Sequence, residues 1–159
     1  MIDAIDHSTA LTLAVRAGCM EAVHSLMMQG ADVNTADENG ITPLSTAVIG
    51  NNMPMISELI NHGADVNIFN RDGYVHAHES QREHVLFAFQ SHANLNVTIA
   101  GFTPVQVAAL CGYADVIRYL AEQGADVNTP NKSGVTPICM ATRNGHADAI
   151  KALAEHCAD

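Results

Sequence analysis

One five-residue phrase, Gly-Ala-Asp-Val-Asn, occurs three times in this chain, at residues 30–34, 63–67 and 124–128. A weaker copy, His-Ala-Asn-Leu-Asn, lies at 92–96, and a partial copy stands at 157–159. Recurrence at a fixed period of this size indicates small units that cannot bury their apolar side alone and must stack on one another. The repeat therefore favours a solenoid over a fold with one central core.

A second phrase precedes each copy. It reads TALTLAV, TPLSTAV, TPVQVAA and TPICMAT, starting at Thr9, Thr42, Thr103 and Thr136, and a degenerate version, VHAHES, starts at Val75. Threonine caps helix N-termini, and proline fits the first helical position because its missing N–H is not needed there. Glycine or asparagine follows each regular phrase, where a left-handed helix end favours them. Each unit is thus predicted to hold two helices.

Together the two phrases resemble the ankyrin repeat, whose pattern is G-x-TPLHxAAxxGH, an apolar helix and then GADVN. The resemblance covers about five repeats within a single domain spanning 1–159, at roughly 4–34, 35–67, 68–96, 97–128 and 129–159. It implies an all-α solenoid of helix–turn–helix pairs joined by β-hairpin loops. Hairpin tips and first helices would then line a concave side.

The predicted third repeat departs from this pattern. Val75 and His76 replace the Thr-Pro start, and the distance from Val75 to His92 is four residues shorter than the matching distance in the first two repeats. Loss of a side-chain cap costs a helix about 1 kcal/mol. From the sequence alone, whether this repeat is a binding site or a structural defect stays open, as does whether the chain is complete.

Composition and charge limit the class of partner. Seventeen acidic and seven basic residues give a net charge of −10, so no basic face for nucleic acid or an anionic membrane is expected. The balance favours a protein partner with a basic surface and, we expect, a monomeric chain. The four cysteines show no metal-ligand spacing, and neither a signal peptide nor a membrane span is visible. These features favour an intracellular, cytoplasmic location, with the nucleus or delivery into a host cell left open.

Side chains that could carry chemistry form no recognisable motif. The densest group is His76, His78, Glu79 and His84, but helical spacing would point His76 and His78 to opposite sides. His78 and His146 stand where the ankyrin pattern itself has histidine, which favours a structural role. No GxSxG, HExxH or P-loop is present. We therefore expect no enzyme activity, no cofactor and no metal.

The resemblance implies that a partner contacts the variable hairpin-tip positions and the end of each first helix. Aromatic and apolar side chains there would carry most of the binding energy. The alternative is that they fill the gap left by the third repeat, and that the acidic tips are simply solvated. The predicted partner-binding residues are Glu38, Asn39, Ile41, Phe69, Arg71, Asp72, Tyr74, Ile99, Phe102, Leu110, Lys132 and Arg143.

The sequence supports three functional hypotheses. The first is a non-catalytic protein–protein interaction module, an adaptor or inhibitor; in length the chain is similar to the small ankyrin inhibitors of cyclin-dependent kinases. The second is a targeting domain of a larger multidomain protein, such as a pathogen effector, whose activity lies outside this chain. The third makes the chain a substrate, because the family resemblance implies asparaginyl hydroxylation at Asn34, Asn67 and Asn128.

Overall fold

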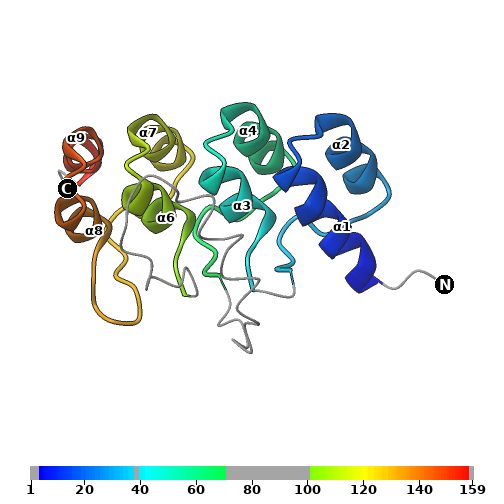
Figure 1. Ribbon diagram of the computed structural model, residues 1–159, viewed down its shortest axis with the longest axis horizontal. Helices are drawn as coiled ribbons and strands as arrows, with labels where there is room; N and C mark the ends of the chain where they lie inside the picture. The colour runs from blue at the N-terminus through cyan, green and yellow to red at the C-terminus, as the bar shows by residue number, and fades with distance from the viewer. Residues whose placement is uncertain (1–3, 38–39, 71–100, 158–159) are drawn as a thin grey trace.

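The computed structural model describes residues 4–37, 40–70 and 101–157, with side chains from Ala10 onward. These residues form helix pairs that lie side by side, with α2, α4, α7 and α9 in one row and α1, α3, α6 and α8 in a second (Figure 1). The all-α prediction is confirmed. The helices are α1 (Ala4–Arg16), α2 (Met20–Met28), α3 (Pro43–Ile49), α4 (Met53–Asn61), α6 (Pro104–Cys111), α7 (Ala114–Glu122), α8 (Pro137–Arg143) and α9 (Ala147–His156).

Threonine and proline set the starts of three first helices, as predicted. The Thr42 hydroxyl accepts a hydrogen bond from the Ser45 N–H at 3.2 Å, directly before Pro43 opens α3. Thr103 and Gln106 form a reciprocal capping box at the start of α6. Thr136 precedes α8 without a side-chain cap bond. The start of α8 therefore depends on Pro137 and on packing rather than on a cap.

The first helix differs from its counterparts in length. α1 begins at Ala4, well before Thr9, and runs for 13 residues, whereas α3 has 7. Ala10 stands where the later repeats have proline. Proline removes a backbone donor and restricts the residue before it to extended conformations, so it stops a helix from extending backward. Without that block, α1 continues toward the N-terminus.

The turn after α3 needs a residue in the left-handed region. Asn51 occupies it with φ of +50°, and it is the non-glycine residue with positive φ in the described chain. Asparagine tolerates this conformation better than other residues with a Cβ. The prediction that Asn51 replaces the usual glycine is therefore confirmed.

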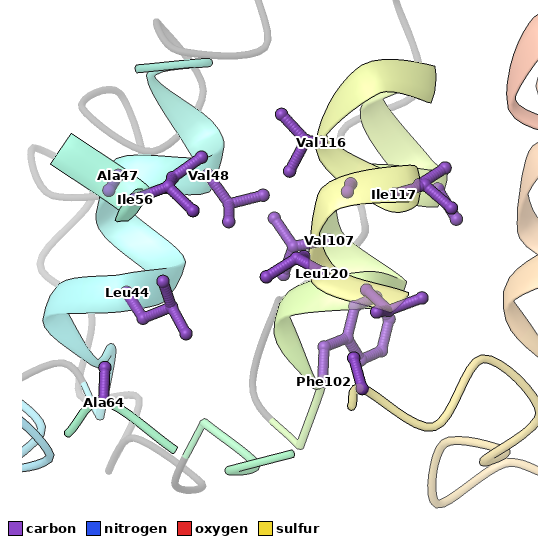
Figure 2. Packing of buried hydrophobic residues seen from close by; sticks show 14 of the residues in the cluster. Leu44, Ala47, Val48, Ile56, Ala64, Phe102, Val107, Val116, Ile117 and Leu120 are labelled. Carbon is purple, nitrogen blue, oxygen red and sulfur yellow. The ribbon is translucent and has the colours of Figure 1, made fainter. Parts of the chain in front are cut away.

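The core runs between neighbouring helix pairs as one continuous cluster. α1 packs against α3, α3 against α6, α6 against α8, and α7 against α9. Figure 2 shows side chains of the α3/α4 pair and of the α6/α7 pair filling the space between them, among them Val48, Val107 and Val116, none of which has exposed surface. Small aliphatic side chains allow helices to approach closely, which suits thin layers. The second helices contribute Val23, Met55, Ile56, Leu59, Ile117, Leu120, Ala152 and Leu153.

The described helix pairs have a defined order of contacts. The α3/α4 pair lies directly against α6/α7, the pair predicted as the fourth repeat. The Tyr113 hydroxyl donates to the Ile49 carbonyl at 3.3 Å, and the Tyr119 hydroxyl lies 3.1 Å from the Ser57 hydroxyl. Within the described residues, the α3/α4 and α6/α7 pairs are therefore direct neighbours. The predicted repeat at 68–96, including His76, His78, Glu79 and His84, lies outside the described residues beyond Asn70.

Candidate interaction surface

The loops before α3 and α8 are closed by the same two backbone hydrogen bonds. Asp37 and Asn131 each donate their N–H to the carbonyl oxygen four residues further on, at 2.9 Å in both loops. Gly40 and Gly134 each donate back to these residues, also at 2.9 Å. Two residues lie between the bonded ends of each loop in the sequence, and in the second loop residues 132–133 form the hairpin tip.

The loop before α6 keeps these closing bonds around a much longer segment. Asn70 donates its N–H to the Phe102 carbonyl at 2.8 Å, and Gly101 donates to the Asn70 carbonyl at 2.8 Å. Residues 71–100, thirty in number, stand where the other loops have two. The Asn70 side chain also accepts from the Thr42 N–H at 3.3 Å, which ties this hairpin to the preceding one. Asn70 and Gly101, the described residues that flank this segment, are therefore held together at a hairpin.

Asparagine side chains join consecutive layers on the loop side of the second helices. The Asn34 amide donates to the Gly63 carbonyl at 3.1 Å, and its oxygen accepts from the Asp65 N–H at 2.7 Å. This pair of bonds uses both ends of the amide. Asn34 therefore serves as a bridge between the first and second layers.

Asn67 makes the same two bonds to the layer that follows it in space. Its amide donates to the Gly124 carbonyl at 3.3 Å, and its oxygen accepts from the Asp126 N–H at 2.8 Å. The Asn128 backbone N–H and the Thr129 hydroxyl lower the pKa of Asp126 by bonding its carboxylate. The Asn67 bonds confirm independently that the second layer and the α6/α7 layer are neighbours. Hydroxylation at Asn34, Asn67 and Asn128 stays a prediction. The side-chain amides of Asn34 and Asn67 are already hydrogen-bonded to the next layer.

The predicted partner-binding residues divide into four groups, which are buried, half-buried, exposed, and outside the described part of the chain. Ile41 and Phe102 belong to the core, with 5% and 8% of their surface exposed, so they offer little area to a partner. Both side chains belong to the hydrophobic core cluster. Leu110 is half-buried. Six residues lie outside the described part of the chain: Glu38, Asn39, Arg71, Asp72, Tyr74 and Ile99.

Phe69, Lys132 and Arg143 are exposed. Phe69 retains 45% of its surface in solvent, and its neighbour Asn70 is bonded to Gly101. A Cβ placed on Gly101 would lie 3.4 Å from the Lys132 side chain, so these two hairpins touch. Figure 1 shows the loop between α7 and α8 projecting beyond the first helices, on the side opposite the second helices. We call the exposed surface of Phe69, Lys132, Ser133, Cys139 and Arg143 the tip face.

The first helices of the two middle layers contribute little to any open groove. Every residue of Pro43–Val48 in α3 and of Pro104–Ala109 in α6 is buried. In the outer layers, by contrast, Leu13 of α1 is 54% exposed and Cys139 of α8 is exposed. Accessible first-helix surface in the described chain is therefore concentrated at the ends of the stack.

All four cysteines are free, and they differ in exposure. Cys19 and Cys139 are exposed, whereas Cys111 and Cys157 are half-buried. Cys111 lies at the end of α6, where burial raises the pKa of its thiol from 9.0 to about 12. Burial and the neighbouring Cys111 also raise the pKa of Tyr113.

This difference gives a labelling prediction. At pH 8 we expect a maleimide reagent to modify Cys19 and Cys139 at least about tenfold faster than Cys111, because the reactive species is the thiolate. Peptide mass spectrometry of the folded chain measures the three rates. In denaturant the rates should converge. Equal rates in the folded chain would contradict the assigned burial of Cys111.

His146 has the structural role that the pattern predicts. Its ring lies beside Gly112, and its Nε2 is 3.1 Å from the Leu110 carbonyl oxygen. Sequence reasoning passed over a second histidine group, formed by His24, Glu58 and His62 on α2 and α4. The sequence contains a pattern that indicates this group. Glu58 and His62 are four residues apart on one helix, and His24 precedes Glu58 by 34 residues, about one repeat.

Comparison with known proteins agrees with the architecture. The family model described as ankyrin repeats (3 copies) matches residues 11–86 and 74–159. A search of curated proteins found no match. Among the described helices, none has both the length and the apolar character required to cross a bilayer. Ankyrin repeats generally mediate protein–protein interaction and typically carry no catalytic activity. The matched residues, the stacked helix pairs and the recurring hairpins together show that this chain belongs to the ankyrin repeat family.

Proposed function

We propose that this chain is a non-catalytic interaction module that binds a partner protein through the tip face. The observation that carries the proposal is a pair of contacts. The residue after Phe69 bonds to Gly101, and Gly101 lies beside the Lys132 side chain, so the two hairpins touch. Exposed aromatic rings and arginine side chains are typical of interface anchors. Framework residues of the hairpins are held by backbone bonds, so a partner would meet a preorganised surface.

The charge of the tip face is local. The chain as a whole carries −10, yet the exposed residues of the tip face include two cations, Lys132 and Arg143. A partner that contacts Phe69 with an apolar pocket and Lys132 and Arg143 with carboxylates would match this surface. The acidic remainder of the chain would still attract a partner with basic surroundings.

Two pairs of matched variants test the proposal. Phe69→Ser removes an exposed apolar side chain from the tip face, and Met28→Ser removes one, 72% exposed, from a second helix. Arg143→Glu and Lys151→Glu make the same charge reversal on α8 and on α9. Partners are captured from the native lysate and quantified by mass spectrometry, after circular dichroism shows that all variants fold equally. We expect Phe69→Ser and Arg143→Glu to lower capture at least about tenfold, as removal of interface anchors does, and the controls to keep it. Equal capture by all four would place binding off the tip face.

A further inference from the structure

Three metal-ligating side chains converge on the second helices, in the row opposite the hairpin tips. His24 comes from α2, and Glu58 and His62 come from α4. One candidate ligand atom of each residue lies within 4.8 Å of those of the other two. The Nδ1 atoms of His24 and His62 lie 3.4 and 3.5 Å from Glu58 Oε1. The cluster therefore joins two neighbouring layers.

We propose that His24, Glu58 and His62 form a Zn²⁺ site linking α2 to α4. Neutral imidazole and carboxylate are zinc ligands, and two histidines with one glutamate make a recognised three-ligand set. Zinc–ligand bonds of about 2.0–2.1 Å place neighbouring ligands of a tetrahedral site about 3.3–3.4 Å apart. The distances from both imidazole Nδ1 atoms to Glu58 Oε1 are close to that edge length, so coordination requires only small side-chain movements.

The His24 and His62 rings meet edge to face and are not stacked, which suits two ligands that point at one metal ion. Their centroids are 5.9 Å apart and their planes meet at 87°. His62 also places Nδ1 2.9 Å from the backbone carbonyl oxygen of Glu58. If His62 binds the metal through Nε2, this hydrogen bond remains and orients the ring. If it binds through Nδ1, the metal bond replaces the hydrogen bond.

The position of the site on α4 favours a cation. His62 is the C-cap residue of that helix, where carbonyl groups without helical partners produce a negative potential. No lysine or arginine stands in the last turn of α2 or α4. Positive charge at this helix end is thus supplied by the histidines when protonated, or by a bound metal ion.

The cluster is open to solvent, with 57%, 27% and 33% of the side-chain surface of His24, Glu58 and His62 exposed. Metal ions can therefore enter without unfolding, and a fourth coordination position stays available to water. A metal bound between α2 and α4 stabilises the folded state by mass action and holds the terminal first layer onto the second. This inference does not depend on the proposed tip face.

Isothermal titration of the 159-residue chain with Zn²⁺ tests the site. We expect saturable binding of one ion and an increase in melting temperature, with both lost in His24→Ala and in His62→Ala. The matched control is His156→Ala, which removes an exposed histidine from α9. Cys19→Ser controls for the exposed thiol that directly precedes α2. Both controls should bind as the natural chain does, and Mg²⁺, which prefers oxygen ligands, should produce no shift.

A spectroscopic readout separates metal binding from a structural role. In histidine side-chain NMR spectra, Zn²⁺ should shift the ring signals of His24 and His62 and leave those of His156 unchanged. Acidification should reverse the shift, because the ligands must be deprotonated. The proposal is overturned if the natural chain shows no saturable Zn²⁺ binding, or if binding persists in His24→Ala and disappears in Cys19→Ser. In the first case the cluster has no metal-binding role, and in the second the thiol is the site.

Discussion

A chain in which residues 71–100 are replaced by the dipeptide Lys-Ser is expected to fold into the same four helix pairs and to be more stable than the natural chain. The replacement copies residues 132–133, which close the equivalent hairpin before α8. Asn70 and Gly101 already hold the two closing hydrogen bonds, both at 2.8 Å. Shortening a closed loop from 30 residues to 2 lowers its closure entropy cost, and the logarithmic dependence on length gives a gain of about 2 kcal/mol.

Chemical denaturation followed by circular dichroism measures this difference in the free energy of unfolding. A second variant, with residues 71–100 scrambled at constant composition and length, should have the stability of the natural chain. If this segment instead formed a stacked layer, as the repeat pattern alone suggests, both variants would lose several kcal/mol or fail to fold. The experiment thus decides between a hairpin insertion and a fifth repeat.

Gly112→Ala is expected to lower the free energy of unfolding by about 2 to 4 kcal/mol, which sums left-handed backbone strain and local overpacking. Gly112 has φ of +79°. A Cβ at this position would lie 2.6 Å from His146 Nδ1 and 2.7 Å from its Cγ. The imidazole cannot simply move aside, since its Nε2 is held 3.1 Å from the Leu110 carbonyl oxygen.

Gly145→Ala is the matched control for this effect. Gly145 has φ of +71°, and a Cβ added there would meet no atom within 4 Å, so the variant carries the backbone penalty of about 1 to 2 kcal/mol and no clash. The double variant Gly112→Ala/His146→Ala should recover part of the loss. Equal destabilisation by Gly112→Ala and Gly145→Ala would show that the imidazole moves freely, and that the two helix pairs are not coupled through this contact.

The local features of the fold were predictable because they depend on residues close in the chain. Thr42 and Pro43 are adjacent, and together they set the start of α3. Asn51 takes the left-handed turn position that glycine holds elsewhere. The candidate site was less predictable: Phe69, Lys132 and Arg143 are exposed as expected, whereas Ile41 and Phe102 are buried. The sequence does not show whether an apolar residue in a loop faces a partner or the next layer. Only its packing in the folded chain distinguishes the two.

The sequence by itself determined the family, the helix pairs and the hairpins between them, because each repeat carries its own caps, turns and apolar positions within about 33 residues. Only the tertiary structure decided which layers are neighbours. Asn67 bonds to Gly124 and Asp126, and Tyr119 to Ser57, across about 60 residues of chain. The same holds for His24, Glu58 and His62, which meet through stacking of two layers. Local sequence patterns fix each helix pair, and only long-range contacts show which described pairs pack together.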